Sequence, residues 1–265
     1  MLDSLSPARR RLVLLVVGAV TLLLVAVVGV VVVRAATGGT DPVAQDRPGP
    51  VLLVSGYGGS TRSLEPLRST LESVGRDVVV VAPVGDGTGD IAEQARDLGD
   101  QADAALERFA ATSVDVVGYS AGGVVAREWV RSFGGDGVAR RVLSVGSPQH
   151  GTDVAELGAG LGTSCPTACQ QLVPDSTLLR ELNAGDETPD GPAFVSVWST
   201  SDEVVVPTDT ARLAGALNFT VQSVCPRDRS SHGRLPADPV VQAALATVLG
   251  VNAPAAPTGV TCSGS

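Results

Sequence analysis

The chain of 265 residues contains no lysine, only two histidines and few aromatic side chains. Because every cation is an arginine, no glycine-rich loop can end in the Lys-Ser/Thr pair of a phosphate-binding P-loop. With aromatic residues at 3% and hydrophobic residues at 44%, the core must be built from valine, leucine and alanine. This composition suits a valine-rich parallel sheet covered by alanine- and leucine-rich helices.

Positive charge is scarce outside the N-terminus. The formal net charge is −9, and residues 1–34, with four arginines and one aspartate, contribute +3 to it. Residues 35–265 therefore carry −12, and they contain no basic patch. Because nucleic acid repels an acidic body of this kind, we expect no nucleic-acid partner.

The N-terminus carries a long hydrophobic run. Three arginines, residues 9–11, precede 22 uncharged and mostly apolar residues, 12–33. As a helix this run would be about 33 Å long, enough to cross a hydrocarbon core of about 30 Å. Because arginines favour the cytoplasmic side, we predict a cytoplasmic stub and transmembrane anchor over residues 1–34, with the rest outside the cytoplasm. The alternative is a cleaved signal peptide and a secreted protein, since residues 33–35 have the small-residue spacing of a cleavage site.

Four cysteines suit an extracytoplasmic location. Of the three possible connectivities, the most economical joins Cys165 to Cys169 and Cys225 to Cys262. These bonds would tie down one loop and the C-terminal tail, residues 251–265. A metal site at Cys-x3-Cys is the alternative, but neither histidine lies near Cys165 in the sequence. We expect disulfides, and neither a metal nor an organic cofactor.

After a Thr-, Gly-, Pro- and Asp-rich linker, residues 35–50, apolar runs alternate with helical patterns over residues 51–250. The expected strands cover residues 51–54, 78–82, 114–118, 141–145, 193–198 and 217–224, and the expected helices 63–74, 91–110, 121–133 and 239–249. This alternation predicts an α/β domain with a mostly parallel central sheet and helices on both faces. Between residues 149 and 192 a glycine-rich polar stretch, with one expected helix near 176–182, breaks the alternation. We interpret it as a cap over the sheet edge.

The segment Gly-Tyr-Ser-Ala-Gly, residues 118–122, lies where an expected strand ends and an expected helix begins. In that context the G-x-S-x-G pattern predicts a sharp turn that exposes Ser120 as a nucleophile, because only small neighbours fit there. The helix start also supplies partial positive charge to a developing anion. A serine that only caps the helix is the alternative.

A nucleophilic serine needs a base, and only His150 and His232 are available. After a nucleophile on such a turn, the acid follows in the chain and the histidine comes last. His232 lies between the last expected strand and the closing helix, as this order requires. We therefore predict His232 as the base and expect His150 to have a rim or structural role.

The predicted acid is Asp202, four residues beyond Trp198 at the end of an expected strand. Its carboxylate would orient the imidazole and stabilise the imidazolium. Glu203 is the adjacent alternative. The weaker candidates, none of which directly ends a strand, are Asp186, Asp190 and Asp209.

Two backbone N–H groups are expected to bind the oxyanion. One belongs to Ala121, directly after the nucleophile, and the other to Tyr57 in the glycine-rich loop 55–59. Such a loop can also cradle phosphate. This one lacks both the P-loop ending and the spacing of a dinucleotide-binding fingerprint.

Six segments of the chain occur in the order found in a known family: VLLVSGYGG, VDVVGYSAGGVVAR, VGSPQHGT, CPTACQQLVPDSTLLRELN, STSDEVVVP and SSHG. Over roughly residues 50–250 the chain thus resembles bacterial lipases and esterases of the α/β-hydrolase fold, particularly the small secreted triacylglycerol-lipase-like members. Those members often carry His-Gly where this chain has Ser55-Gly56. The resemblance implies ester hydrolysis through an acyl-serine intermediate, with the substrate admitted beneath the cap.

These features predict a membrane-anchored, extracytoplasmic serine esterase or lipase acting on a small-molecule or lipid ester. One alternative is an acyltransferase or thioesterase with the same three catalytic residues. The other is an inactive hydrolase fold that serves as a binding module. The intact set of Ser120, Asp202 and His232 argues against this last alternative.

Overall fold

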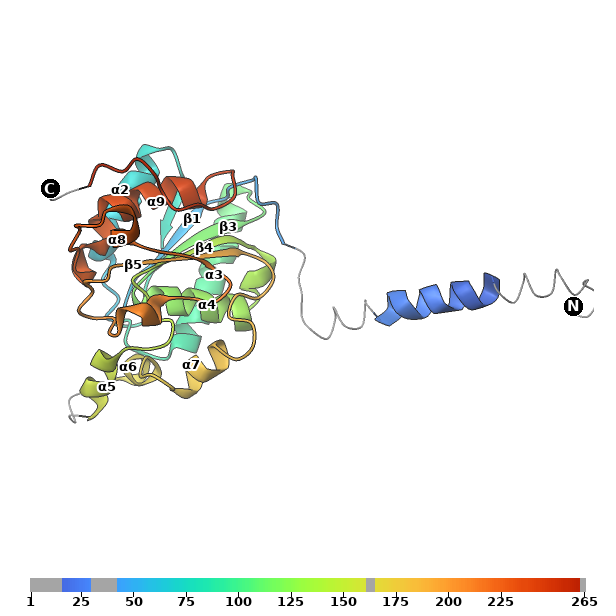
Figure 1. Cartoon of the computed structure of the whole chain (residues 1–265), viewed down its shortest axis with the longest axis horizontal. Coiled ribbons are helices and arrows are strands. Elements are labelled where there is room, and N and C mark those ends of the chain that lie inside the picture. The colour runs from blue at the N-terminus through green and yellow to red at the C-terminus, as the bar shows by residue number, and fades with distance from the viewer. Residues whose placement is uncertain (1–15, 30–41, 161–164, 263–265) are drawn as a thin grey trace, which may run out of the picture. The chain divides into compact units, whose positions relative to one another are not determined.

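The computed structural model describes residues 16–29, 42–160 and 165–262 of the chain. Two compact units are present, Met1–Thr40 and Asp41–Ser265. In the first, residues 16–29 form an exposed helix (Figure 1), and residues 12–15 and 30–33 of the predicted anchor lie outside the described part. Among the described residues, no helix is both long and apolar enough to cross a membrane.

The second unit is built on a six-stranded sheet in the order β2-β1-β3-β4-β5-β6, and each neighbouring pair is parallel. The strands are β1 (Val51–Val54), β2 (Val78–Val80), β3 (Val114–Tyr119), β4 (Ala139–Val145), β5 (Ala193–Trp198) and β6 (Leu217–Thr220). Every residue of β3 and β4 is buried. This explains the continuous apolar runs, because helices cover both faces of the sheet. The predicted α/β architecture is confirmed.

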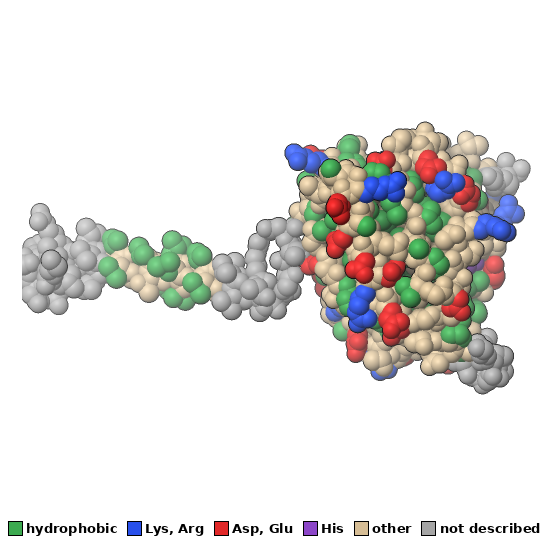
Figure 2. Space-filling view, turned by 180° about the vertical axis from the view of Figure 1, so that it is seen from behind, with side chains coloured by type: hydrophobic (Ala, Val, Ile, Leu, Met, Phe, Trp, Pro, Cys, Tyr) green, Lys and Arg blue, Asp and Glu red, His purple; other side chains and the backbone are tan. Residues whose placement is uncertain are grey.

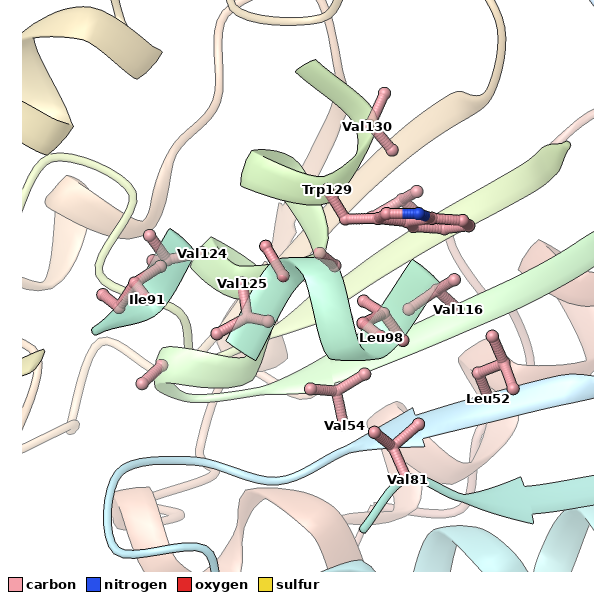
Figure 3. Close-up of a cluster of buried hydrophobic side chains, with 14 of the residues drawn as sticks. Leu52, Val54, Val81, Ile91, Leu98, Val116, Val124, Val125, Trp129 and Val130 are labelled. Carbon is pink, nitrogen blue, oxygen red and sulfur yellow. The ribbon is translucent and has the colours of Figure 1, made fainter. Parts of the chain in front are cut away.

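Two pairs of helices enclose the sheet, as Figure 1 shows. On one face lie α3 (Ile91–Phe109) and α4 (Ala121–Ser132), and on the other α2 (Glu65–Ser73) and α9 (Pro239–Leu249). In Figure 3 the strand side chains Leu52 and Val116 meet Leu98 of α3 and Trp129 of α4. Trp129 is among the largest fully buried side chains of a core that is otherwise mostly valine, leucine and alanine.

The last strand is shorter than the sequence predicts. The expected strand over residues 217–224 ends at Thr220, and Val221–Val224 forms the short helix α8. The Thr220 hydroxyl accepts the Ser223 N–H at 3.0 Å, which caps this helix and ends the strand.

In the described residues between β4 and β5 there are three helices where the sequence predicts one. They are α5 (Asp153–Gly160), α6 (Thr167–Gln171) and α7 (Thr177–Leu182), and they lie on the α3 and α4 side of the sheet (Figure 1). A disulfide joins Cys165 to Cys169 at α6. A second joins Cys225, just after α8, to Cys262 in the C-terminal tail. Both are the pairs that the sequence favours.

A buried ion cluster closes the end of the sheet where the strands begin. Asp115 of β3 accepts hydrogen bonds from Arg76 at 2.7 Å and from the fully buried Arg140 at 2.6 Å. The Arg140 guanidinium also donates to the carbonyl oxygens of Gln45 and Leu249. These bonds join the segment before β1 and the end of α9 to the sheet. On the face shown in Figure 2, by contrast, acidic and arginine side chains are interspersed on the surface.

We predict that Arg140→Met lowers the free energy of unfolding by about 3–5 kcal/mol, because it leaves the buried Asp115 with one cation and removes the arginine donor of the Gln45 and Gly250 oxygens. Urea denaturation of the full chain, followed by tryptophan fluorescence, measures this loss. The control is Arg68→Met, which removes exposed ion pairs to Glu65 and Glu72 and should change stability little. Equal effects of the two substitutions would contradict the prediction.

Candidate active site

Ser120 occupies a strained turn between β3 and α4. Its backbone angles are φ 55° and ψ −127°, a region that residues other than glycine rarely adopt. A Cβ at Gly118 would lie 2.5 Å from the carbonyl carbon of Gly122, and one at Gly122 would lie 2.4 Å from the Val54 oxygen. The two glycines of the pattern are therefore required by contact with neighbouring backbone.

The structure brings Ser120, His232 and Asp202 together at the carboxyl ends of the strands. The Ser120 Oγ lies 2.9 Å from His232 Nε2, and His232 Nδ1 lies 2.7 Å from Asp202 Oδ2. A carboxylate only accepts, so Nδ1 carries the proton and Nε2 is free to accept from the serine hydroxyl. The His232 and Asp202 side chains are only 7% and 1% exposed, which shields these bonds from water.

The turn after β5 fixes the orientation of Asp202. Its second oxygen, Oδ1, accepts the N–H groups of Val204 at 2.8 Å and Val205 at 2.9 Å. With Oδ1 held in this way, the other oxygen, Oδ2, contacts the imidazole of His232. Glu203, the adjacent alternative, instead accepts the backbone N–H of His232 at 3.0 Å. This contact was missed by the sequence analysis, because no pattern in the chain pairs a side chain with a distant main-chain group.

His150, the other histidine, lies in the cap. Its Nε2 is 3.0 Å from Glu187, and its Nδ1 is 3.2 Å from the Thr210 oxygen. Burial opposes ionisation of Glu187, but hydrogen bonds from His150 and the Ala214 N–H outweigh it and lower the pKa of this carboxyl. His150 thus joins the cap to the segment after β5, apart from Ser120.

Arg127 of α4 joins this helix to the cap, residues 149–192. The sequence analysis missed this role. The arginine side chain is buried, and it donates to Gln149 Oε1 at 3.1 Å, to Asn183 Oδ1 at 3.0 Å and to the Leu182 oxygen at 3.0 Å. Burial lowers the pKa of Arg127 to about 10, so the guanidinium stays charged at neutral pH. A charged residue on the apolar helix directly after the nucleophile was the available signal.

The loop after β1 contacts the serine directly. A Cβ at Gly56 would lie 2.8 Å from the Ser120 Cβ. Within the described part of the chain, the Tyr57 N–H in this loop donates no backbone hydrogen bond, and the Ala121 N–H, at the start of α4, is one of the groups that lack a partner inside a helix. Ala121 is also the first residue of α4, where the helix dipole supplies partial positive charge.

A cavity of about 260 Å³ opens beside Ser120. Its other lining residues are mostly apolar and come from the β1 loop, the cap and the turn after Asp202: Tyr57, Pro148, Thr152, Val154, Ala155, Cys169, Leu172, Val204 and Val205. No group of three or more potential metal ligands exists within the described ranges. The site therefore combines a hydroxyl next to an imidazole with an apolar cavity, an arrangement suited to acyl transfer through a serine.

The sequence profile of the class 2 lipases matches residues 104–243, which include Ser120, Asp202 and His232. No curated protein sequence matches the chain. Among solved structures, the chain is similar to lipase B from Aspergillus fumigatus, with a TM-score of 0.63 and 18% identity over 79% of this chain and 55% of that one. It is also similar to the propeptide form of the Bacillus licheniformis lipase BlEst2, with a TM-score of 0.66 and 16% identity.

That second match covers 83% of this chain and 54% of the other. The chain therefore spans about half the length of both proteins. The mature form of BlEst2 is matched over 89% of its own length and 74% of this chain, with a TM-score of 0.59 and 15% identity. At these identities the likeness shows a shared fold.

Proposed function

The chain belongs to the class 2 lipase family, a family of carboxylester hydrolases, and from this premise we propose that it hydrolyses esters through a triad of Ser120, His232 and Asp202. The observation that carries the proposal is the unbroken pair of hydrogen bonds, 2.9 Å from serine to imidazole and 2.7 Å from imidazole to carboxylate. The serine hydroxyl donates to the imidazole, and the imidazole N–H donates to the carboxylate, as general-base catalysis needs.

In the proposed reaction, Ser120 Oγ attacks the ester carbonyl while His232 Nε2 takes the hydroxyl proton. Asp202 stabilises the imidazolium, which then gives the proton to the departing alcohol. Water attacks the acyl-serine as His232 removes its proton, and the acid product leaves with Ser120 restored. The N–H groups of Tyr57 and Ala121 bind the oxyanion of each tetrahedral intermediate.

The apolar cavity favours an uncharged acyl group of short or medium length. At about 260 Å³ it is smaller than the roughly 300–1,000 Å³ typical of small-molecule sites. Ala155 and Val205 contribute apolar, buried surface to it. The acyl chain would lie there, with the ester carbonyl at Ser120.

We also propose that residues 12–33 anchor the protein in a membrane and that the catalytic unit lies outside the cytoplasm. The length of the apolar run and the arginines before it support this orientation. Two disulfides in the catalytic unit agree with an oxidising compartment.

We predict that Ser120→Ala and His232→Ala each lower kcat for p-nitrophenyl butyrate by about 10⁴-fold, because loss of one triad member removes nucleophilic catalysis. His150→Ala is the matched control and should keep most of the activity. A fluorophosphonate, which reacts with an activated serine, should label the wild type and not Ser120→Ala. If His150→Ala were as inactive as His232→Ala, the assignment of the base would be wrong.

Ala155→Phe should raise KM for p-nitrophenyl octanoate and leave the acetate ester nearly unaffected, because the ring fills part of the cavity. Steady-state kinetics over a series of acyl lengths measures this difference. Ala104→Phe adds the same ring to the exposed face of α3 and serves as the control. Equal losses for acetate and octanoate would show that the cavity does not hold the acyl chain.

The full chain, produced in a bacterium, should stay with the membrane after an alkaline wash and hydrolyse a membrane-impermeant ester supplied to intact spheroplasts. Deletion of residues 12–33 should abolish both properties, because it removes the proposed anchor. A soluble extracytoplasmic product that lacks residues 1–34 would instead establish a cleaved signal peptide.

A further inference from the structure

His232 is held by its main chain as well as by its ring. Its backbone N–H donates to Glu203 Oε2 at 3.0 Å, and its carbonyl oxygen accepts the hydroxyl of Tyr119 at 3.1 Å. The ring itself bonds Ser120 and Asp202. Four side chains, from two pairs of adjacent residues that lie far apart in the sequence, therefore contact this one residue.

The main-chain contacts matter because His232 begins η5 (His232–Ala237), which follows an irregular loop after α8. The first N–H groups of a helix have no partner within it, and the preceding Ser231 provides no side-chain cap. Glu203 supplies the missing acceptor from across the site. Without it, the N-terminal end of η5 loses a bond at the residue that carries the imidazole.

Glu203 can reach this N–H because it follows Asp202 directly. The Asp202 side chain fixes the turn by accepting the Val204 and Val205 N–H groups. Successive carboxylates of one turn thus bind the same histidine at two points, Asp202 at Nδ1 and Glu203 at the backbone. The Asp202 bond orients the imidazole ring, and the Glu203 bond fixes the position of the His232 backbone.

Tyr119 supports the same residue from the other side. Its ring centroid lies 5.2 Å from that of His232, at an interplanar angle of 31°. Burial, together with the nearby carboxylates of Asp202 and Glu203, raises the pKa of Tyr119 to about 12. The hydroxyl therefore remains a donor to the His232 oxygen at neutral pH.

We propose that Glu203 is a positioning residue for the hydrolysis reaction, which acts by holding the His232 backbone so that Nε2 stays within reach of Ser120 Oγ. The inference rests on the proposed triad. It assigns Glu203 no contact with the substrate and no proton transfer. Because a displacement of about 1 Å in a catalytic group can cost on the order of 10²-fold in rate, one backbone bond is enough to matter.

The test compares Glu203→Ala with Glu203→Gln in the full chain. Glu203→Ala removes the acceptor and should lower kcat for p-nitrophenyl butyrate about 10–100-fold, with little change in KM, because the acyl cavity is intact. The rate of labelling by a fluorophosphonate should fall in parallel. Glu203→Gln keeps an amide oxygen for the His232 N–H and should recover kcat to within about threefold of wild type.

Glu107→Ala is the matched control, since it removes one exposed carboxylate from α3 and should leave kcat unchanged. Wild-type kcat in Glu203→Ala would overturn the inference, as would a Glu203→Gln variant as slow as Glu203→Ala. A rise in KM with constant kcat would also overturn it. Urea denaturation of each variant identifies any loss of folded protein. If wild type itself neither hydrolyses the ester nor takes the label, the proposed function fails, and this outcome is distinct from failure of the Glu203 inference.

Discussion

The unusual backbone of Ser120 is the constraint on which the rest of the site depends. A residue at φ 55° and ψ −127° persists only where its surroundings hold it. Here α4 lies so close to β3 and to the end of β1 that Gly118 and Gly122 have no room for a side chain. The same contacts bring the loop after β1 against the serine. Packing of α4 against the sheet therefore holds the turn at Ser120. The turn after β5 and the start of η5 place Asp202 and His232 beside it.

Buried and half-buried arginines stabilise this structure at both ends of the sheet. At the end where the strands begin, Arg140 and Arg76 bind Asp115 and join chain segments that are far apart in sequence. At the opposite end, Arg127 joins α4 to the cap. Each guanidinium satisfies several carbonyl or amide oxygens at once, which a hydrophobic side chain cannot do. Burial of these charges is tolerable because they are paired or hydrogen-bonded.

Local patterns in the sequence were enough to predict the parallel sheet, the turn at Ser120 and the order of Asp202 and His232. Runs of valine indicated buried strands, and the spacing of the glycines indicated the turn. Only two histidines could act as the base, so each pattern left few alternatives. The sequence did not predict that Leu217–Val224 divides into β6 and α8. The strand-like pattern continues through residue 224, and the side-chain cap of Thr220 that starts the helix is not visible in it. The partners of Glu203 and Arg127 could not be predicted either, although the charge of Arg127 within an apolar helix was a signal of its role. Their contacts join side chains to groups that are distant in sequence, such as the His232 N–H for Glu203 and the Leu182 oxygen for Arg127, and no periodicity records such pairs.

The Arg127 contacts also make the stability of the cap depend on that of helix α4. The guanidinium is covered only while residues 149–187 are in place, since Gln149, Asn183 and Glu187 provide most of its partners. Lifting the cap would break these hydrogen bonds of Arg127, so we expect the cap and α4 to unfold cooperatively. Exchange of the cap for another insertion would then require a matching change at Arg127 of α4 as well.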